Sequence, residues 1–373
     1  TKLRPATRIV TISTIDWPSG YVDAEGEEAA ALRAATATDR PNAVNLLLVQ
    51  DFNEVGTLGI AAIARENGLR NRAAREAVRL GYRGYRQWIR KYADWPELDI
   101  WYDVVGTDRF ANYAQREDDQ TTARLLERAD TRTSRGAFDK LTAVKDGRRR
   151  IAEKPPYRTH KLTQHAPELE AAIRRYLGSL PDHVQRVLGH FDLVDVVQQV
   201  VGVGSVGMRV FLLLAEERRT GDPLFMQFKQ AGPSVYEPFL GPSRYPEHGQ
   251  RVVNGQRLLQ SASDAFLGWT DSAVGDGHAY YVRQFRDGKV VPNGEEIAGK
   301  LAAYAFACGH VLARAHARSG DVAAINDYLG KSDQVEDAFT RFAFAYDDQT
   351  ARDHAQLAEA IEAGRIAAIP GWP

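Results

Sequence analysis

The residues best suited to chemistry are Gly202, Gly204 and Gly207, which with Ser205 form a G-x-G-x-x-G loop. Glycines let a backbone approach phosphate oxygens closely and direct its N–H groups at them. The pattern alone is weak, because a tight turn without any ligand can contain the same glycines. Its meaning therefore depends on the residues that flank it.

Two nucleotide-binding folds use such a loop. A dinucleotide-binding fold needs a helix directly after it, whereas a protein kinase carries it on a strand hairpin. The apolar run 206–214 fits either element, but the turn at 220–223 follows soon after and favours a hairpin. Asp222 stands 20 residues after Gly202, near the ribose-binding spacing, so an oxidoreductase of the dinucleotide-binding type remains an alternative.

Lys229 ends an expected strand over 224–229, one hairpin and one strand after the loop. A lysine there can face the same cleft and neutralise two phosphates, although most strand lysines are simply hydrated. Glu237 follows in a short segment, and we expect it to hold Lys229 by the ion pair that a kinase requires. On the expected strand 279–285, Arg283 and Gln284 are predicted near the adenine edge or the hinge.

A second set of candidates ends the long helix expected over 294–318. His316 lies in its last turn, and Asp321 follows just beyond the helix. In a kinase-like domain, such a helix leads to the catalytic loop, where a His packs the backbone and an Asp accepts the substrate's proton. The alternative interpretation is that the cationic side chains here only compensate the dipole of the helix C-terminus.

Metal and thiol chemistry has less support. Asp51 opens an Asp-Phe-Asn-Glu stretch after the apolar run 43–49 and could hold Mg²⁺, although a solvated turn is the simpler interpretation. The sequence has no zinc-type Cys/His spacing, no H-E-x-x-H and no G-x-S-x-G. Its lone cysteine, Cys308, is expected to be structural and fits a reducing cytoplasm.

Composition bounds the class of protein. The 373 residues suggest two or three domains, and the 44% apolar fraction is enough for a real core. A net charge of −1 gives no global field to recruit nucleic acid or an anionic membrane, and no apolar run is long enough to span one. The chain begins at Thr1 rather than Met, so we expect a fragment or a processed product.

The expected elements divide the chain into four regions. Residues 1–60 are atypical and expected to be poorly ordered, with one helix at 25–37. Residues 61–190 should be helical and include an amphipathic helix at 69–92 with a basic solvated face, a helix at 118–128 and a hairpin turning at Asp146-Gly147. Residues 191–290 form the nucleotide-binding small lobe, and residues 291–373 the C-terminal helical region.

These residues together resemble a bacterial family known as domain of unknown function 2252, which is grouped with the protein-kinase-like fold and the aminoglycoside phosphotransferases. The resemblance extends from about Ala61 to the C-terminus, and Leu312–Asp321 and the glycine loop are its most specific parts. The matching stretches are Arg148–Pro156, Val201–Arg209, Gln227–Glu237, Arg251–Arg257, Tyr281–Asp287, Cys308–Asp321 and Tyr346–Asp353.

The resemblance implies a circularly permuted α+β fold of the kinase-like type, a small antiparallel sheet with a Gly-rich loop flanked by a mostly helical body. It implies ATP and Mg²⁺ as cofactors and phosphoryl transfer to an unknown small molecule or protein. Family members usually carry a Gly-Asp-x-His-x-x-Asn-Phe-Gly stretch followed by Asp-Phe-Asp-Glu. This chain lacks the first, and only Asp51–Glu54 is similar to the second, as truncation or a shifted reading frame would explain. The alternative is a pseudokinase-like or partner-binding scaffold without turnover.

Overall fold

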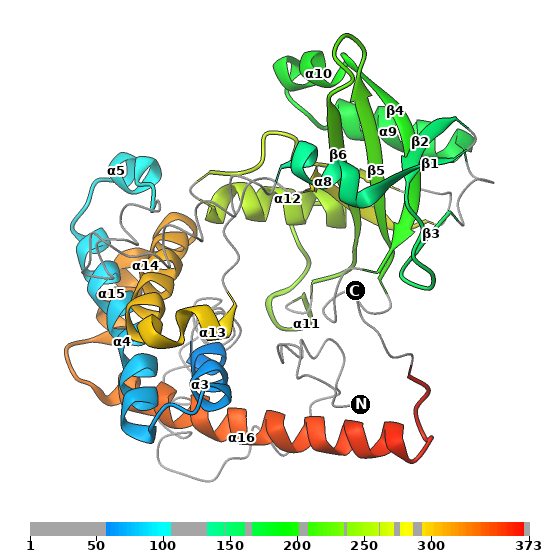
Figure 1. The fold of residues 1–373 in the computed structure, drawn as a ribbon. Coiled ribbons are helices and arrows are strands. Elements are labelled where there is room, and N and C mark those ends of the chain that lie inside the picture. The colour runs from blue at the N-terminus through cyan, green and yellow to red at the C-terminus, as the bar shows by residue number, and fades with distance from the viewer. Residues whose placement is uncertain are drawn as a thin grey trace. The chain divides into compact units, whose positions relative to one another are not determined.

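The structure, a computed structural model, separates into two compact units. The first unit contains the described residues up to 105 and from 293 onward, and the second contains those between 133 and 285. Each unit is described by itself below (Figure 1). The described residues are 57–105, 133–145, 147–160, 166–200, 208–234, 237–260, 262–271, 277–285 and 293–368.

The described part of the first unit is built of helices. Their bounds are α3 (Thr57–Glu66), α4 (Asn71–Ala93), α5 (Glu97–Tyr102), α13 (Gly294–Ile297), the 3₁₀ turn η4 (Ala298–Lys300), α14 (Leu301–Ser319), α15 (Val322–Leu329) and α16 (Gln334–Glu362). The helix predicted at 69–92 is confirmed as α4. None of the helices in the described residues has the length and apolar character needed to cross a membrane.

The predicted helix 294–318 is wrong in one respect, because η4 interrupts it. Asn293 accepts a hydrogen bond from the Glu296 N–H, and the Glu296 side chain accepts one from the Asn293 N–H, which begins α13 before the interruption. Gly299 lies inside the 3₁₀ turn, and glycine is a poor helix former. The chain therefore starts α14 anew at Leu301.

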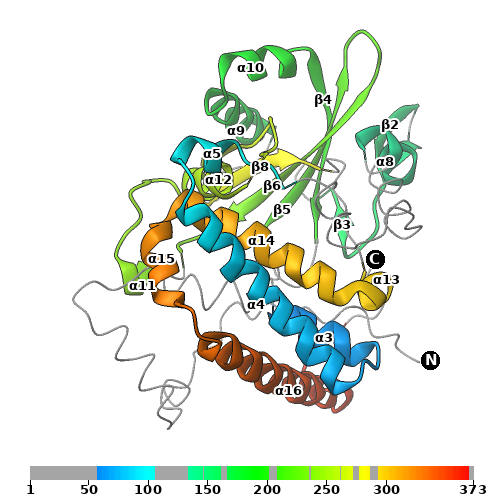
Figure 2. The same cartoon turned by 90° about the vertical axis from the view of Figure 1, so that its left-hand side faces the viewer.

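Helices α4 and α14 run side by side in the first unit (Figure 2). Their backbones approach closely because glycines lie at the contact. A Cβ atom on Gly309 would overlap the Gly81 carbonyl oxygen and come within 2.7 Å of the Tyr85 nitrogen. A Cβ on Gly84 would come within 2.5 Å of the Phe306 carbonyl oxygen. The contact leaves no room for a methyl group at these positions.

The second unit combines strands and helices. Its strands are β1 (Thr142–Lys145), β2 (Arg148–Ile151), β3 (Arg158–Thr159), β4 (Phe191–Gln199), β5 (Val210–Glu217), β6 (Pro223–Ala231), β7 (Gly268–Asp271) and β8 (Ala279–Gln284). Its helices are α8 (Ser134–Leu141), α9 (Ala166–Gly178), α10 (Asp182–Leu188), α11 (Glu237–Leu240) and α12 (His248–Leu259).

The strands pair antiparallel throughout the described residues, in a small sheet β1-β2 and a larger sheet of order β3-β4-β5-β6-β8-β7. The predicted hairpin is confirmed as β1-β2, where Gly147 takes the left-handed φ of 71° that this turn needs. The dinucleotide-binding alternative is wrong, because a strand, β5, follows the glycine loop and the strands of the described residues pair antiparallel.

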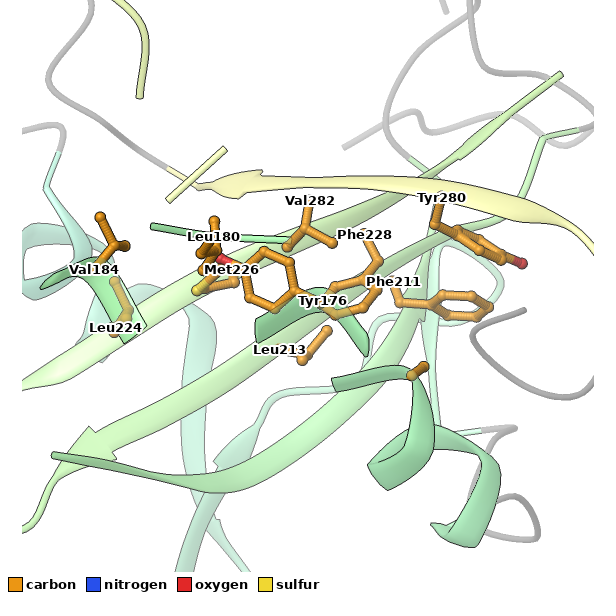
Figure 3. Close-up of a cluster of buried hydrophobic side chains, with 11 residues drawn as sticks. Tyr176, Leu180, Val184, Phe211, Leu213, Leu224, Met226, Phe228, Tyr280 and Val282 are labelled. Carbon is orange, nitrogen blue, oxygen red and sulfur yellow. The ribbon is translucent and has the colours of Figure 1, made fainter. Parts of the chain in front are cut away.

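Side-chain alternation divides the larger sheet into two faces. On the first face, Leu224, Met226 and Phe228 of β6 belong to a buried cluster (Figure 3). The same cluster contains Tyr176 in the last turn of α9 and Leu180 just after this helix. On the second face, Phe225 of β6 joins a cluster with residues of α8. Figure 2 shows α9 and α8 on opposite sides of the strands. The mixed helix and antiparallel-sheet content confirms the α+β class.

The glycine contact between α4 and α14 gives a stability prediction. Gly309→Ala should lower the free energy of unfolding by about 3 kcal/mol, because the methyl group must push the two helices apart. Gly59→Ala is the control, since nothing lies within 4 Å of a Cβ there, and it should raise stability by up to about 1 kcal/mol. Urea unfolding measures both, and equal values for the two variants would contradict the close contact.

Candidate functional site

The glycine loop belongs to the connection between β4 and β5, which are neighbours paired antiparallel. Gly202, Gly204, Ser205 and Gly207 themselves lie outside the described residues, as do Asp51 and the helices predicted at 25–37 and 118–128. The strands on either side, β4 and β5, pair antiparallel, and the role of the glycines between them stays a prediction.

Lys229 lies on β6, directly opposite Val210, the first residue of β5. The next residue pair, Arg209 and Gln230, is joined by two hydrogen bonds. The Arg209 N–H donates to Gln230 Oε1 at 2.9 Å, and the Gln230 N–H donates to the Arg209 carbonyl at 2.9 Å. The half-buried lysine therefore stands at the end of the sheet where β5 emerges from the loop. Its role in nucleotide binding stays a prediction.

The second face of the sheet carries the polar groups around Lys229. Because β6 alternates, Gln227 and Lys229 share this face with Phe225, and Gln227 is buried. On β8, Tyr281 lies opposite Lys229 and Arg283 opposite Gln227, while Val282 points into the cluster of the first face. Arg283 is thus the diagonal neighbour of Lys229 across the strand pair, where Cβ atoms are about 7–8 Å apart.

Helix α12 adds a second arginine near this position. A Cβ on Gly249 would overlap the Tyr280 carbonyl oxygen and touch the Trp269 Cβ at 3.0 Å, so α12 lies directly against β8 and β7. From the next turn, Arg251 Nη2 donates to the Gly232 carbonyl at 2.7 Å, just after β6 ends. Sequence analysis named Arg251 only within a stretch that resembles the family, because nothing in the sequence shows which strand end its helix contacts.

Arg251 and Arg283 each have a buried N–H donor, at Nε, that makes no hydrogen bond among the described residues. A buried donor left in this state costs about 1–3 kcal/mol. An anionic ligand with oxygen acceptors would remove that cost, so these two groups fit the phosphate chemistry expected at Lys229.

The contacts of Glu237 and Gln284 do not test the roles predicted for them. Glu237 begins α11, where its N–H donates to the Ser234 carbonyl at 3.0 Å, and its ion pair with Lys229 stays a prediction. Gln284 lies on β8 as expected, and its N–H donates to Asp264 Oδ2 at 2.5 Å. Asp264 thereby fixes the end of β8, while the adenine-edge role of Arg283 and Gln284 also stays a prediction.

His316 and Asp321 lie in the first unit and have structural contacts there. His316 is buried, and its Nδ1 lies 2.8 Å from the Tyr85 hydroxyl of α4. Asp321 caps α15, because its Oδ1 accepts a hydrogen bond of 3.0 Å from the Ala324 N–H. These contacts explain both residues as parts of the fold, and their catalytic roles stay predictions.

Two further expectations concern a thiol and a metal. Burial raises the pKa of the Cys308 thiol on α14 to about 11, which keeps it protonated and unreactive at neutral pH. Within the part of the chain that the structure describes, no three His, Cys, Asp or Glu side chains gather as a metal-ligand set. The described residues therefore supply no metal site of their own.

A carboxylate–imidazole–carboxylate cluster at β4 was missed by sequence analysis. His160 Nε2 lies 2.9 Å from Asp195 Oδ2, and His160 Nδ1 lies 2.9 Å from Glu153 Oε1. Asp195 Oδ2 also accepts a 2.7 Å hydrogen bond from the Ile151 N–H of β2. The three residues match no motif, and Asp195 is 35 residues from His160, so the pairing of β3 with β4 is needed to bring it to the other two.

The fold and the site define an α+β protein with an antiparallel sheet and a helical body. The chain belongs to a family described as uncharacterized proteins conserved in bacteria, domain of unknown function 2252, whose model matches residues 56–360. The family expected from sequence is thus confirmed. No curated protein matches the chain, and no solved structure does either.

The His160 cluster gives a pH prediction. Partial burial lowers the pKa of His160, but the hydrogen bonds to Asp195 and Glu153 outweigh this effect, so its pKa is raised above 6.5. A raised pKa in the folded state adds stability that is fully present below the unfolded pKa and lost as pH rises through the folded pKa. The stability difference between wild type and His160→Gln should therefore shrink with increasing pH.

Urea unfolding between about pH 5.5 and pH 8.5 spans the relevant window. His183→Gln is the matched control, because His183 is exposed on α10 and has no side-chain partner among the described residues. A stability difference for His160→Gln that stays constant across this range would show that the imidazolium does not bridge the two carboxylates.

Proposed function

We propose that this protein is an ATP-binding, kinase-like phosphotransferase whose acceptor is an unknown small molecule or protein. The observation that carries the proposal is the rung Val210–Lys229, which stands beside the connection containing the glycine loop. An amine at that place can reach phosphates that the loop's backbone N–H groups cradle.

The order of elements supports a kinase-like small lobe. In protein kinases, a glycine-rich loop covers the phosphates, the phosphate-binding lysine is on the third strand, and a helix then supplies the lysine's partner. Here β4 and β5 flank the loop, β6 carries Lys229, and α12 follows. The circular permutation expected from the resemblance is part of the same proposal.

The electrostatics support a polyphosphate ligand. Lys229 and its diagonal neighbour Arg283 lie on adjacent strands, Arg251 contacts Gly232 just after β6 ends, and both arginines hold an unused buried donor. Guanidinium groups pair with phosphate oxygens especially well, because their planar fork matches the geometry of the anion. ATP fits these residues, and Gly202, Gly204, Ser205 and Gly207 would hold its phosphates.

One departure from the kinase pattern concerns the partner of the lysine. Helix α12 contains no acidic residue in its sequence HGQRVVNGQRLL, so it cannot give the carboxylate that a kinase helix gives. Glu237 precedes the helix and is the candidate we retain for that role. Mg²⁺ would arrive with the nucleotide, since this ion is usually held mostly by phosphates and water with one or two carboxylates.

The catalytic roles proposed are those of Asp321 as proton acceptor and His316 as the residue that packs its loop. A specific observation favours a second candidate, a nucleotide-binding scaffold without turnover: His316 is buried against Tyr85 and Asp321 is used as a helix cap. The chain also lacks the His-x-x-Asn stretch of its family. The two candidates share nucleotide binding and differ in phosphate release.

Nucleotide binding is tested by thermal unfolding with Mg·ATP. The wild type should melt several degrees higher, because ligand at 100 times its Kd stabilises a protein by about 2.7 kcal/mol. Lys229→Ala should abolish the rise, and Arg283→Gln and Arg251→Gln should each weaken binding by about tenfold. Lys145→Ala, on the exposed hairpin strand β1, is the matched control and should leave the rise intact.

If no nucleotide shifts the wild-type melting temperature, the proposal fails. A rise that persists in Lys229→Ala would place the nucleotide elsewhere. Release of ADP or phosphate on adding acceptor mixtures separates the phosphotransferase from the scaffold, since the scaffold binds ATP without consuming it.

A further inference from the structure

The first unit has an open surface cavity of about 320 Å³. Basic side chains make up almost all of its lining. The lining residues are Arg83, Arg86, Gln87, Arg90 and Lys91 from α4, and Lys331, which follows α15. The five α4 positions are three to four residues apart or adjacent, so they share one side of the helix.

An ion-pair network fixes the frame of this cavity. The fully buried carboxylate of Glu336 on α16 accepts hydrogen bonds from Arg79 Nε at 3.1 Å and Arg83 Nη2 at 3.0 Å. Arg86 joins the same network, donating from Nη1 to the Ser332 carbonyl at 2.7 Å and from Nη2 to Asp333 Oδ1 at 2.9 Å. These contacts attach the segment that bears Lys331 to α4.

Three arginines of α4 take part in the ion-pair network. Three other cations that line the cavity do not. Arg79, Arg83 and Arg86 face the carboxylates of Glu76, Asp333, Glu336 and Asp337. Arg90, Lys91 and Lys331 have no acidic partner among the described residues. Lys91 is held by a different contact, with its ammonium 4.1 Å from the centre of the Trp88 ring.

The dipole of α4 accounts for only part of this surplus. Basic residues in the last turn of a helix are favourable, which covers Arg90 and Lys91. Lys331 comes from another element: Gly330, in the left-handed region at φ 58°, ends α15 and turns the chain before it. Two segments thus bring exposed cations to one cavity, where an anion would reduce their mutual repulsion.

We propose that this cavity binds a small anion with two or three linked phosphate groups. Three cations without an acidic partner among the described residues match the charge of such a ligand, and Arg90 can meet a phosphate with two parallel hydrogen bonds. The volume lies at the lower end of small-molecule sites, which favours a compact ligand over an acidic polymer. The proposal concerns the first unit alone and does not depend on nucleotide binding at Lys229.

Isothermal titration with inorganic triphosphate tests the proposal on the full chain. The titration is carried out in the Lys229→Ala background, so that the sheet of the second unit does not contribute. We expect one site per chain, weakened by at least about tenfold in Arg90→Gln/Lys331→Gln. Arg72→Gln/Lys145→Gln is the control with the same charge change at two exposed positions, and its affinity should be unchanged.

Three results would overturn the proposal. Absence of binding at millimolar triphosphate, or equal weakening in both double variants, would exclude a specific site. Citrate bound as tightly as triphosphate would exclude the phosphate class, because only charge would then be recognised. The proposal is supported if triphosphate still binds at about 0.5 M salt when the cavity residues are intact and no longer binds in Arg90→Gln/Lys331→Gln. Non-specific attraction to surface charge is screened at that ionic strength.

Discussion

The antiparallel pairing of β5 with β6 is the constraint on which the functional interpretation of the second unit depends. Once Val210 lies opposite Lys229, the alternation of side chains decides which residues share a face with the amine and which enter the core. Arg283 is then carried to the same face by the pairing of β6 with β8. A register shift of one residue would bury Lys229 among the side chains beside Tyr176 and remove the cationic cluster.

Local patterns were sufficient for the elements whose signal lies within the element itself. The 3.6-residue period gave α4, and the Asp-Gly turn gave the β1-β2 hairpin, because these depend on short-range geometry. Strand β7 was missed, since its four residues Gly-Trp-Thr-Asp become a strand only by pairing with β8. Arg251 was missed for the same reason, as its position is set by the contact of α12 with β7 and β8.

The basic side of α4 was expected to be solvated, and the structure shows contacts there that the sequence did not indicate. An arginine-rich stripe on an amphipathic helix is normally solvated, and the sequence indicated no more than that. The structure gives three of these arginines a buried partner, Glu336, which lies at least 250 residues away in the chain. The glycine contact between α4 and α14 depends on atoms equally remote in sequence. Such pairings arise from tertiary packing and have no local signature.

The string from Leu312 to Asp321 carries much of the family resemblance, yet its described contacts belong to the fold of the first unit. Arg314 is almost fully buried and donates to the main-chain oxygens of Asp103 and Trp101, and His316 contacts Tyr85. A buried guanidinium must keep its acceptors, so packing alone requires these residue types here. These contacts explain the residue types of the string through packing, whereas the catalytic roles proposed for His316 and Asp321 need a group that packing does not require and stay predictions.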